Sequence, residues 1–193
     1  MNYSEVIASV AAWAKRDDLN SMMSRFCTIT ETRINRKLRV RQMENALAPT
    51  LIDASFKVAL PAWFVGTKTL VLQGEEDSPL EPRSVDVVTA KQNAGWMAKS
   101  FAVTSDSWLF DGTGTASGTY YKAVSSLEAN STNWLADSYP DVYLWGMLSE
   151  VFQYEHAPEI AAQFEGRFSS LMAEMMGNDQ RDRYTNSLTS RKV

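Results

Sequence analysis

The sequence has one cysteine, Cys27, and one histidine, His156, among its 193 residues. A lone cysteine cannot close an internal disulfide or build a multi-cysteine metal site. Nucleophilic triads and most transition-metal sites depend on imidazole, so a single histidine leaves few kinds of enzyme. We expect His156, just before Pro158, to lie at the surface of a turn between helices, and Cys27 to fill space in the core.

Long apolar runs and an excess of basic charge are also missing. No stretch approaches the ~18 apolar residues of a spanning helix, and the N-terminus lacks the basic start and apolar run of a signal peptide. We therefore expect synthesis in a cytoplasm and no membrane partner. The 19 Lys and Arg against 23 Asp and Glu give a net charge of -4. Proteins that grip phosphates usually carry a basic surplus, so DNA binding as the main activity is disfavoured.

Motifs for catalysis or cofactor binding are absent as well. Gly112, Gly114 and Gly118 are not followed by the Lys-Ser or Lys-Thr of a phosphate-binding loop, and we interpret them as a hairpin loop. The acidic run 75–77 lacks the spaced ligands of a calcium loop, and we interpret it as a solvated turn. The sequence therefore predicts no enzyme, cofactor or metal site. A hydrolase with unrecognised paired carboxylates is left as an alternative.

Helical spacing is present at both ends of the chain. Residues 3–16 and 20–38 repeat apolar side chains every three or four positions, and Ser4 is the expected N-cap of the first helix. Helical spacing returns after Asn130. Pro140 fits the first turn of a helix with a wide apolar surface, which predicts a central, buried helix.

The last predicted helix starts at Pro158 and stops at Gly177–Asn178, a natural stop signal. Beyond this signal the sequence is polar and has no sustained apolar period. Between the helical parts lie short β-prone runs separated by turn formers, with one short helix expected over 84–92. The expected strands are Phe56–Leu60, Thr67–Leu72, Ser100–Val103, Trp108–Phe110 and Thr119–Val124.

The sequence thus predicts an α+β fold that is mainly α. The N- and C-terminal helices, 1–41 and 130–177, are expected to pack as one helical bundle. A small antiparallel β-domain, 42–129, is inserted between them, and 178–193 form an extended C-terminal tail.

A basic cluster crowds the end of the second predicted helix. It consists of Arg33, Arg36, Lys37, Arg39 and Arg41. One interpretation is that these cations stabilise the negative end of the helix dipole on a solvated face. The other is an electrostatic contact with an acidic neighbour or with phosphate. Five cations in nine residues exceed what capping needs, so both interpretations stand.

Six tryptophans and seven tyrosines are a further feature of the composition. We expect some, such as Trp13 and Trp134, to fill the core. Others would anchor an interface, where large amphipathic rings are favoured.

Three passages resemble the head–tail connector, or adaptor, proteins of tailed bacteriophages. Arg33–Glu44 is similar to that family's helix end and first strand, and Val58–Phe64 to its Leu-Pro turn with a following aromatic residue. Thr132–Leu135 with Tyr139–Tyr143 resembles its approach to the long central helix. The likeness is to the adaptor proteins of short-tailed phages. In some of these phages an upper tail-tube protein has the adaptor's role, and the sequence is similar to that protein too.

The resemblance implies a structural subunit of the virion. Such a protein would form a ring, a dodecamer, beneath the portal protein, seat the tail or nozzle proteins, and leave a channel in which genome DNA makes transient contact. Its C-terminal tail would dock on the portal or on an adjacent subunit.

We expect the basic cluster to form an interface or channel contact, and four cations of the tail to take part in docking. These four are Arg181, Arg183, Arg191 and Lys192. The alternative is a small nucleic-acid-binding phage protein that uses the same basic helix end.

Overall fold

The chain forms two compact units in a computed structural model, which describes residues 1–16, 18–76 and 78–189, with side chains as far as residue 183. The first unit is built from Met1–Gln42 and from the chain from Val124 onward; the second is Met43–Ala123. The predicted fold class is confirmed, because the molecule is α+β, mainly α, with a small and largely antiparallel β part.

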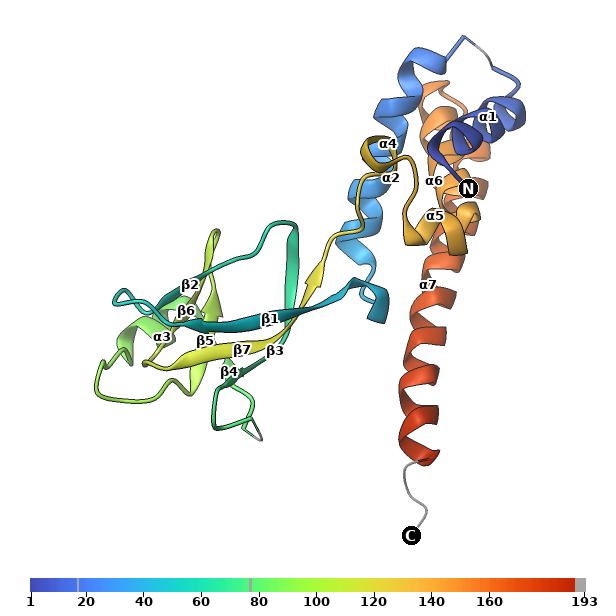
Figure 1. Ribbon diagram of the computed structural model, residues 1–193. Helices are drawn as coiled ribbons and strands as arrows, with labels where there is room; N and C mark the ends of the chain where they lie inside the picture. The colour runs from blue at the N-terminus through green and yellow to red at the C-terminus, as the bar shows by residue number, and fades with distance from the viewer. Residues whose placement is uncertain (17, 77, 190–193) are drawn as a thin grey trace. The chain divides into compact units, whose positions relative to one another are not determined.

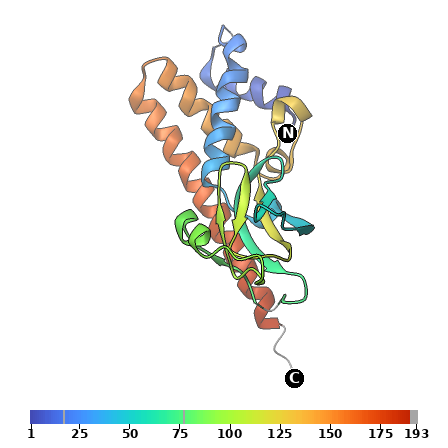
Figure 2. The same ribbon diagram turned by 90° about the vertical axis from the view of Figure 1, so that its left-hand side faces the viewer.

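The first unit is helical (Figure 1). Its α-helices are α1 (Tyr3–Ala14), α2 (Met23–Lys37), α4 (Leu127–Asn130), α5 (Trp134–Ser138), α6 (Pro140–Tyr154) and α7 (Pro158–Thr189), and two 3₁₀ turns, η1 (Asn20–Met22) and η2 (Arg41–Met43), flank α2. Helices α1, α2 and α7 all contact α6, and α6 and α7 lie side by side in both views (Figure 1 and Figure 2).

Helix α6 is the centre of this unit, as its wide apolar surface predicts. Val142, Met147 and Val151 are fully buried. Helices α2 and α7 both approach α6 closely at Gly146. A Cβ atom on this residue would lie 2.5 Å from Cγ2 of Thr30 on α2 and 3.1 Å from the ring of Phe168 on α7. Only glycine therefore allows the three helices to approach as they do.

The N-cap prediction for α1 is wrong by two residues. Asn2, and not Ser4, caps the helix: its Oδ1 accepts the backbone N–H of Glu5 at 2.9 Å, while the Glu5 carboxylate accepts the N–H of Asn2 at 2.8 Å. This reciprocal pair is a capping box, and the carboxylate at the third helical position makes Asn2 the better cap.

The predicted end of the last helix at Gly177–Asn178 is also wrong. Helix α7 runs for 32 residues, against 15 for α6, and extends past it (Figure 1). Residues 178–189, expected as part of an extended tail, are therefore helical. Side-chain pairs at helical spacing support this polar part: Arg183 donates to Asp179 four residues earlier at 2.7 Å, and Arg181 donates to Asn178 at 2.5 Å. Such pairs stabilise a helix that has no apolar face.

The second unit contains two small sheets. Its strands are β1 (Glu44–Leu51), β2 (Lys57–Ala59), β3 (Phe64–Leu72), β4 (Glu81–Pro82), β5 (Ser100–Val103), β6 (Ser107–Phe110) and β7 (Thr115–Lys122), and α3 (Val85–Ala90) is its helix. One sheet has the order β1-β7-β3 and the other β2-β6-β5-β4. All pairs are antiparallel except β4 with β5, and Trp108 lies fully buried in the common core.

Two features of the β unit differ from the sequence expectation. Strand β1 is not among the expected strands. It contains Pro49, which is tolerated because β1 is an edge strand with a bulge between Leu47 and Thr50. The glycine-rich loop is not a hairpin, because β6 and β7 belong to different sheets. Gly118 already lies in β7, where a Cβ atom would be 2.1 Å from the carbonyl oxygen of Thr69.

Two polar side chains on α2 hold the chain where it returns from the β unit. The Oδ1 atom of Asn35 accepts the backbone N–H of Val124 at 2.8 Å. One turn earlier, the Glu31 carboxylate accepts the N–H of Leu127 at 2.6 Å, at the start of α4. The return point of the chain is therefore fixed against the last turns of α2.

Candidate functional site

The basic cluster at the end of α2 divides into residues with internal partners and residues without them. Arg33 is only 18% exposed and forms ion pairs with Glu150 at 2.6 Å and with Glu165. Its guanidinium also lies 4.7 Å from the ring centre of Phe168. Burial opposes ionisation of Glu165, but the hydrogen bond from Arg33 outweighs it and lowers the pKa of that carboxyl. Arg33 thus ties α2 to α6 and α7.

Arg39 and Arg41 also bond within the helical unit. Arg39 donates to the carbonyl oxygens of Asn35 at 2.9 Å and Leu38 at 2.5 Å, which is how a cation caps a helix C-terminus. Arg41 forms ion pairs with Asp179 at 2.8 Å and with Asp182 at 2.6 Å.

Asp179 is the centre of this second set of contacts. Its side chain is 6% exposed and bridges Arg41 and Arg183. It also accepts the backbone N–H of Arg41 at 3.1 Å. Burial raises the pKa of this carboxyl, but the hydrogen bonds from Arg183 and Arg41 outweigh that effect and lower it below the usual value. Arg41 therefore fastens the chain after α2 to the second half of α7, and Arg183 on α7 also binds the Asp179 carboxylate.

Arg36 and Lys37 are different. Both are exposed, and neither forms an ion pair with a residue in the part of the chain that the structure describes. Among the tail cations, Arg181 is exposed and donates to Asn178, and Arg183 is half-buried against Asp179. Arg191 and Lys192 lie outside the described residues. The structure thus singles out Arg36 and Lys37 as adjacent surface cations.

A second surface feature was missed from the sequence, and we name it the aromatic ridge. It consists of Trp13, Trp145, Phe152, Phe164 and Arg167. The ring of Trp13 on α1 meets Trp145 edge-on at 5.1 Å, Trp145 stacks on Phe164 at 5.7 Å, and Phe164 stacks on Phe152 at 5.4 Å. The guanidinium of Arg167 covers Trp145 at 4.8 Å.

The expectation that Trp13 fills the core is wrong, because its side chain is 53% exposed; Trp134 is half-buried. Trp13 lies at the margin of the apolar face of α1, where spacing alone cannot separate core from rim. In the β unit, Trp63 and Trp96 are 73% and 67% exposed. Exposed tryptophans are enriched in interface hot spots, so the expectation that some aromatics anchor an interface stays a prediction for Trp13, Trp63 and Trp96.

The side chains considered for chemistry do not form a reactive group. Cys27 is buried, and burial together with the Glu31 and Glu128 carboxylates raises the pKa of its thiol to about 12. It is therefore protonated at neutral pH and a poor nucleophile. His156 is exposed in the turn between α6 and α7, as predicted.

No three metal-ligating side chains gather within the residues that the structure describes. Over the same residues, the helices are too short or too polar to pass through a lipid bilayer.

Comparison with known protein families gives a match over nearly the whole chain. A model of the SU10 adaptor protein family matches residues 1–191, and no curated protein matches the chain. The matched span includes both units, the basic cluster, the aromatic ridge and nearly all of the C-terminal segment. This agrees with the resemblance to phage head–tail adaptor proteins that three short passages indicated. The chain belongs to the SU10 adaptor protein family of bacteriophage structural proteins.

Proposed function

We propose that the protein is a head–tail connector subunit that forms a ring, a dodecamer, beneath the phage portal and leaves a channel for DNA. The observation that carries the proposal is the family match over residues 1–191. In this proposal the protein belongs to the virion, the portal protein and tail or nozzle proteins are its partners, and genome DNA makes transient contact in the channel.

The charge distribution supports a structural role over the nucleic-acid-binding alternative. Arg33 and Arg41 are neutralised by carboxylates inside the helical unit. Arg39 is half-buried against helix carbonyls. Affinity for DNA rises with the number of phosphates that cations neutralise. Within the basic cluster, Arg36 and Lys37 alone are exposed without a carboxylate partner in the described residues, and two such cations are few for that purpose. A conduit needs weak contact with DNA, so that the genome can slide.

The direct test is cryo-electron microscopy of purified virions. The expected result is a closed ring of this subunit under the portal, with an open axial channel. Virions in which the subunit is absent from the portal vertex contradict the proposal. A salt titration of DNA binding separates the alternative: tight, steeply salt-dependent binding by the isolated chain favours a nucleic-acid-binding protein.

We further propose that Arg36 and Lys37 contact an acidic surface of the portal. The double variant Arg36→Glu, Lys37→Glu is expected to bind purified portal at least about tenfold more weakly, because two attractive contacts become repulsive. The variant should still fold, since neither side chain forms an ion pair within the described residues, and acidic residues in the last turn of α2 should lower its melting temperature only slightly. Arg25→Glu, an exposed residue at the other end of α2, is the matched control and should bind normally. Equal portal affinity in both variants contradicts this contact.

A further inference from the structure

The aromatic ridge is partly open to the surface: Trp13 and Arg167 are exposed, and Trp145, Phe152 and Phe164 are half-buried behind them. It crosses α1, α6 and α7, and Ile160, one turn before Phe164 on α7, extends it with a side chain that is 42% exposed. Arg167 lies against Trp145 and has no carboxylate partner within the described residues. A stacked aromatic surface with an unpaired arginine is what a protein interface uses as an anchor.

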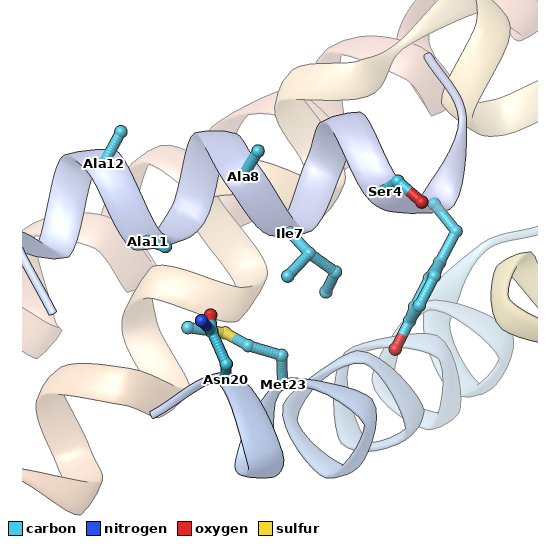
Figure 3. A pocket seen from close by; sticks show the side chains of 8 residues that line it. Ser4, Ile7, Ala8, Ala11, Ala12, Asn20 and Met23 are labelled. Carbon is cyan, nitrogen blue, oxygen red and sulfur yellow. The ribbon is translucent and has the colours of Figure 1, made fainter. Parts of the chain in front are cut away.

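A shallow apolar groove lies along α1, and we name it the α1 groove. Its volume is about 550 Å³, and it is lined by Tyr3, Ser4, Ile7, Ala8, Ala11, Ala12, Asn20 and Met23. Figure 3 shows Ile7 pointing from α1 toward Met23, so the floor of the groove is apolar. The alanines keep its wall low, which leaves room for a large side chain from outside. An indole or phenyl ring would bury much of its surface there.

The ridge and the groove occupy different flanks of the same helix. Trp13 and Ser4 are nine residues apart on α1, which is about two and a half helical turns and places them on opposite sides. A subunit therefore cannot fill its own groove with its own ridge. Two complementary patches on opposite flanks of one rigid unit give a head-to-tail contact, and such contacts close into rings when the rotation between copies permits.

The charges at the two patches are also complementary. Glu128 is exposed and accepts the hydroxyl of Ser24 at 2.7 Å. It lies beside the groove, because Ser24 directly follows Met23 of the groove lining. Burial first, and then the nearby Glu128 carboxylate, raises the pKa of the Tyr3 phenol in the groove wall. Glu128 has no cationic partner within the described residues. The groove thus has an unpaired anion at its rim, and the ridge has an unpaired cation.

We infer that neighbouring copies of this chain join through α1, with the aromatic ridge of one subunit seated in the α1 groove of the next and Arg167 facing Glu128. This inference rests on the proposed ring and adds which surfaces form its joints. Trp13 is the anchor, and the ion pair across the joint fixes its register.

The test is ring assembly on purified portal, scored by electron microscopy. Arg167→Glu and Glu128→Arg are each expected to reduce the number of rings by at least about tenfold, since each places like charges together. The double variant Arg167→Glu, Glu128→Arg restores the attraction and should recover rings to near the level of the unaltered chain. Recovery by charge exchange is not expected if either residue only supports the fold.

A second pair of variants tests the anchor. Trp13→Asp should abolish rings, whereas Trp96→Asp, a similarly exposed tryptophan in the β unit, should retain them. Circular dichroism of each variant checks that the chain is folded. If the unaltered chain forms no ring on the portal, the proposed function fails. If it forms rings and so do Trp13→Asp and both single charge reversals, the ring stands and the joint assigned here is wrong.

Discussion

Gly146 shows how a single residue sets the distance between three helices. A Cβ atom at this position would be 2.5 Å from Thr30, whose short branched side chain cannot move aside. At Gly166 on α7, by contrast, an added Cβ atom would have open space around it. Both glycines lie in helices, and only Gly146 is crowded. The same substitution at both sites therefore separates the effect of crowding from the effect of helix propensity.

We predict opposite signs for the same substitution at these two sites. Gly146→Ala should lower the free energy of unfolding by about 1–2 kcal/mol, because overpacking outweighs the gain in helix propensity. Gly166→Ala should raise it by up to about 1 kcal/mol. Urea denaturation measures both. A stabilised Gly146→Ala variant would mean that the helices do not meet closely there.

Asp179 makes a pH-dependent contribution to stability. Its pKa is lower in the folded chain than the value of about 3.9 expected in the unfolded chain, so the unfolded state binds more protons in acid. The stabilisation is present above the unfolded pKa and is lost as the pH falls through the folded pKa.

We therefore predict that, as the pH falls from about 5 to about 2, the melting temperature of Asp179→Asn falls less than that of the unaltered chain. Melting temperatures across this range measure the difference. Asp86→Asn on α3 is a control, since the Asp86 carboxylate forms no ion pair within the described residues. Parallel pH profiles for Asp179→Asn and the unaltered chain would show that the contact of Asp179 with Arg41 and Arg183 adds no acid sensitivity.

At the scale of elements, the continuation of α7 is the feature least visible in the sequence. The segment after Gly177 has no apolar period, and its support comes from pairs such as Asp179 with Arg183. Proline removes a helix hydrogen bond and clashes with the preceding turn, at a cost of about 3 kcal/mol in a helix interior. In an extended segment the same substitution would be harmless.

Asn178→Pro is thus predicted to reduce the helical signal at 222 nm, whereas Asn178→Ala preserves it. Circular dichroism of the full chain measures both variants. Identical spectra for the two would support an extended segment in place of a continuous α7.

Elements with strong periodicity could be predicted from the sequence. Helices α1, α2 and α6 bury the residues that repeat every three or four positions, and β5 and β6 match their β-prone runs. Contacts between distant parts of the chain could not be predicted. Arg41 and Asp179 are 138 positions apart, and nothing in either neighbourhood indicates the other. For the same reason the aromatic ridge, assembled from three helices, had no local signal.

At the scale of the whole molecule, two arginines of the basic cluster form ion pairs inside the helical unit. Arg33 binds Glu150 and Glu165, and Arg41 binds Asp179 and Asp182. Partly buried pairs of this kind are costly to break on one side, because the remaining charge is left unpaired. Of the basic cluster, Arg36 and Lys37 remain exposed without a carboxylate partner within the described residues, which suits the weak contact with DNA in the proposed channel.

The anchoring of Val124 to Asn35 has a consequence for how adaptor proteins diversify. The chain leaves the helical unit just after α2, and Asn35 returns it to the last turns of that helix. Both ends of the excursion are therefore neighbours, as at sites where whole domains can be inserted or exchanged. Evolution can enlarge, shrink or replace the sheets without re-routing the helices of the helical unit, so lineages that meet different tails would be expected to vary most between residues 43 and 123.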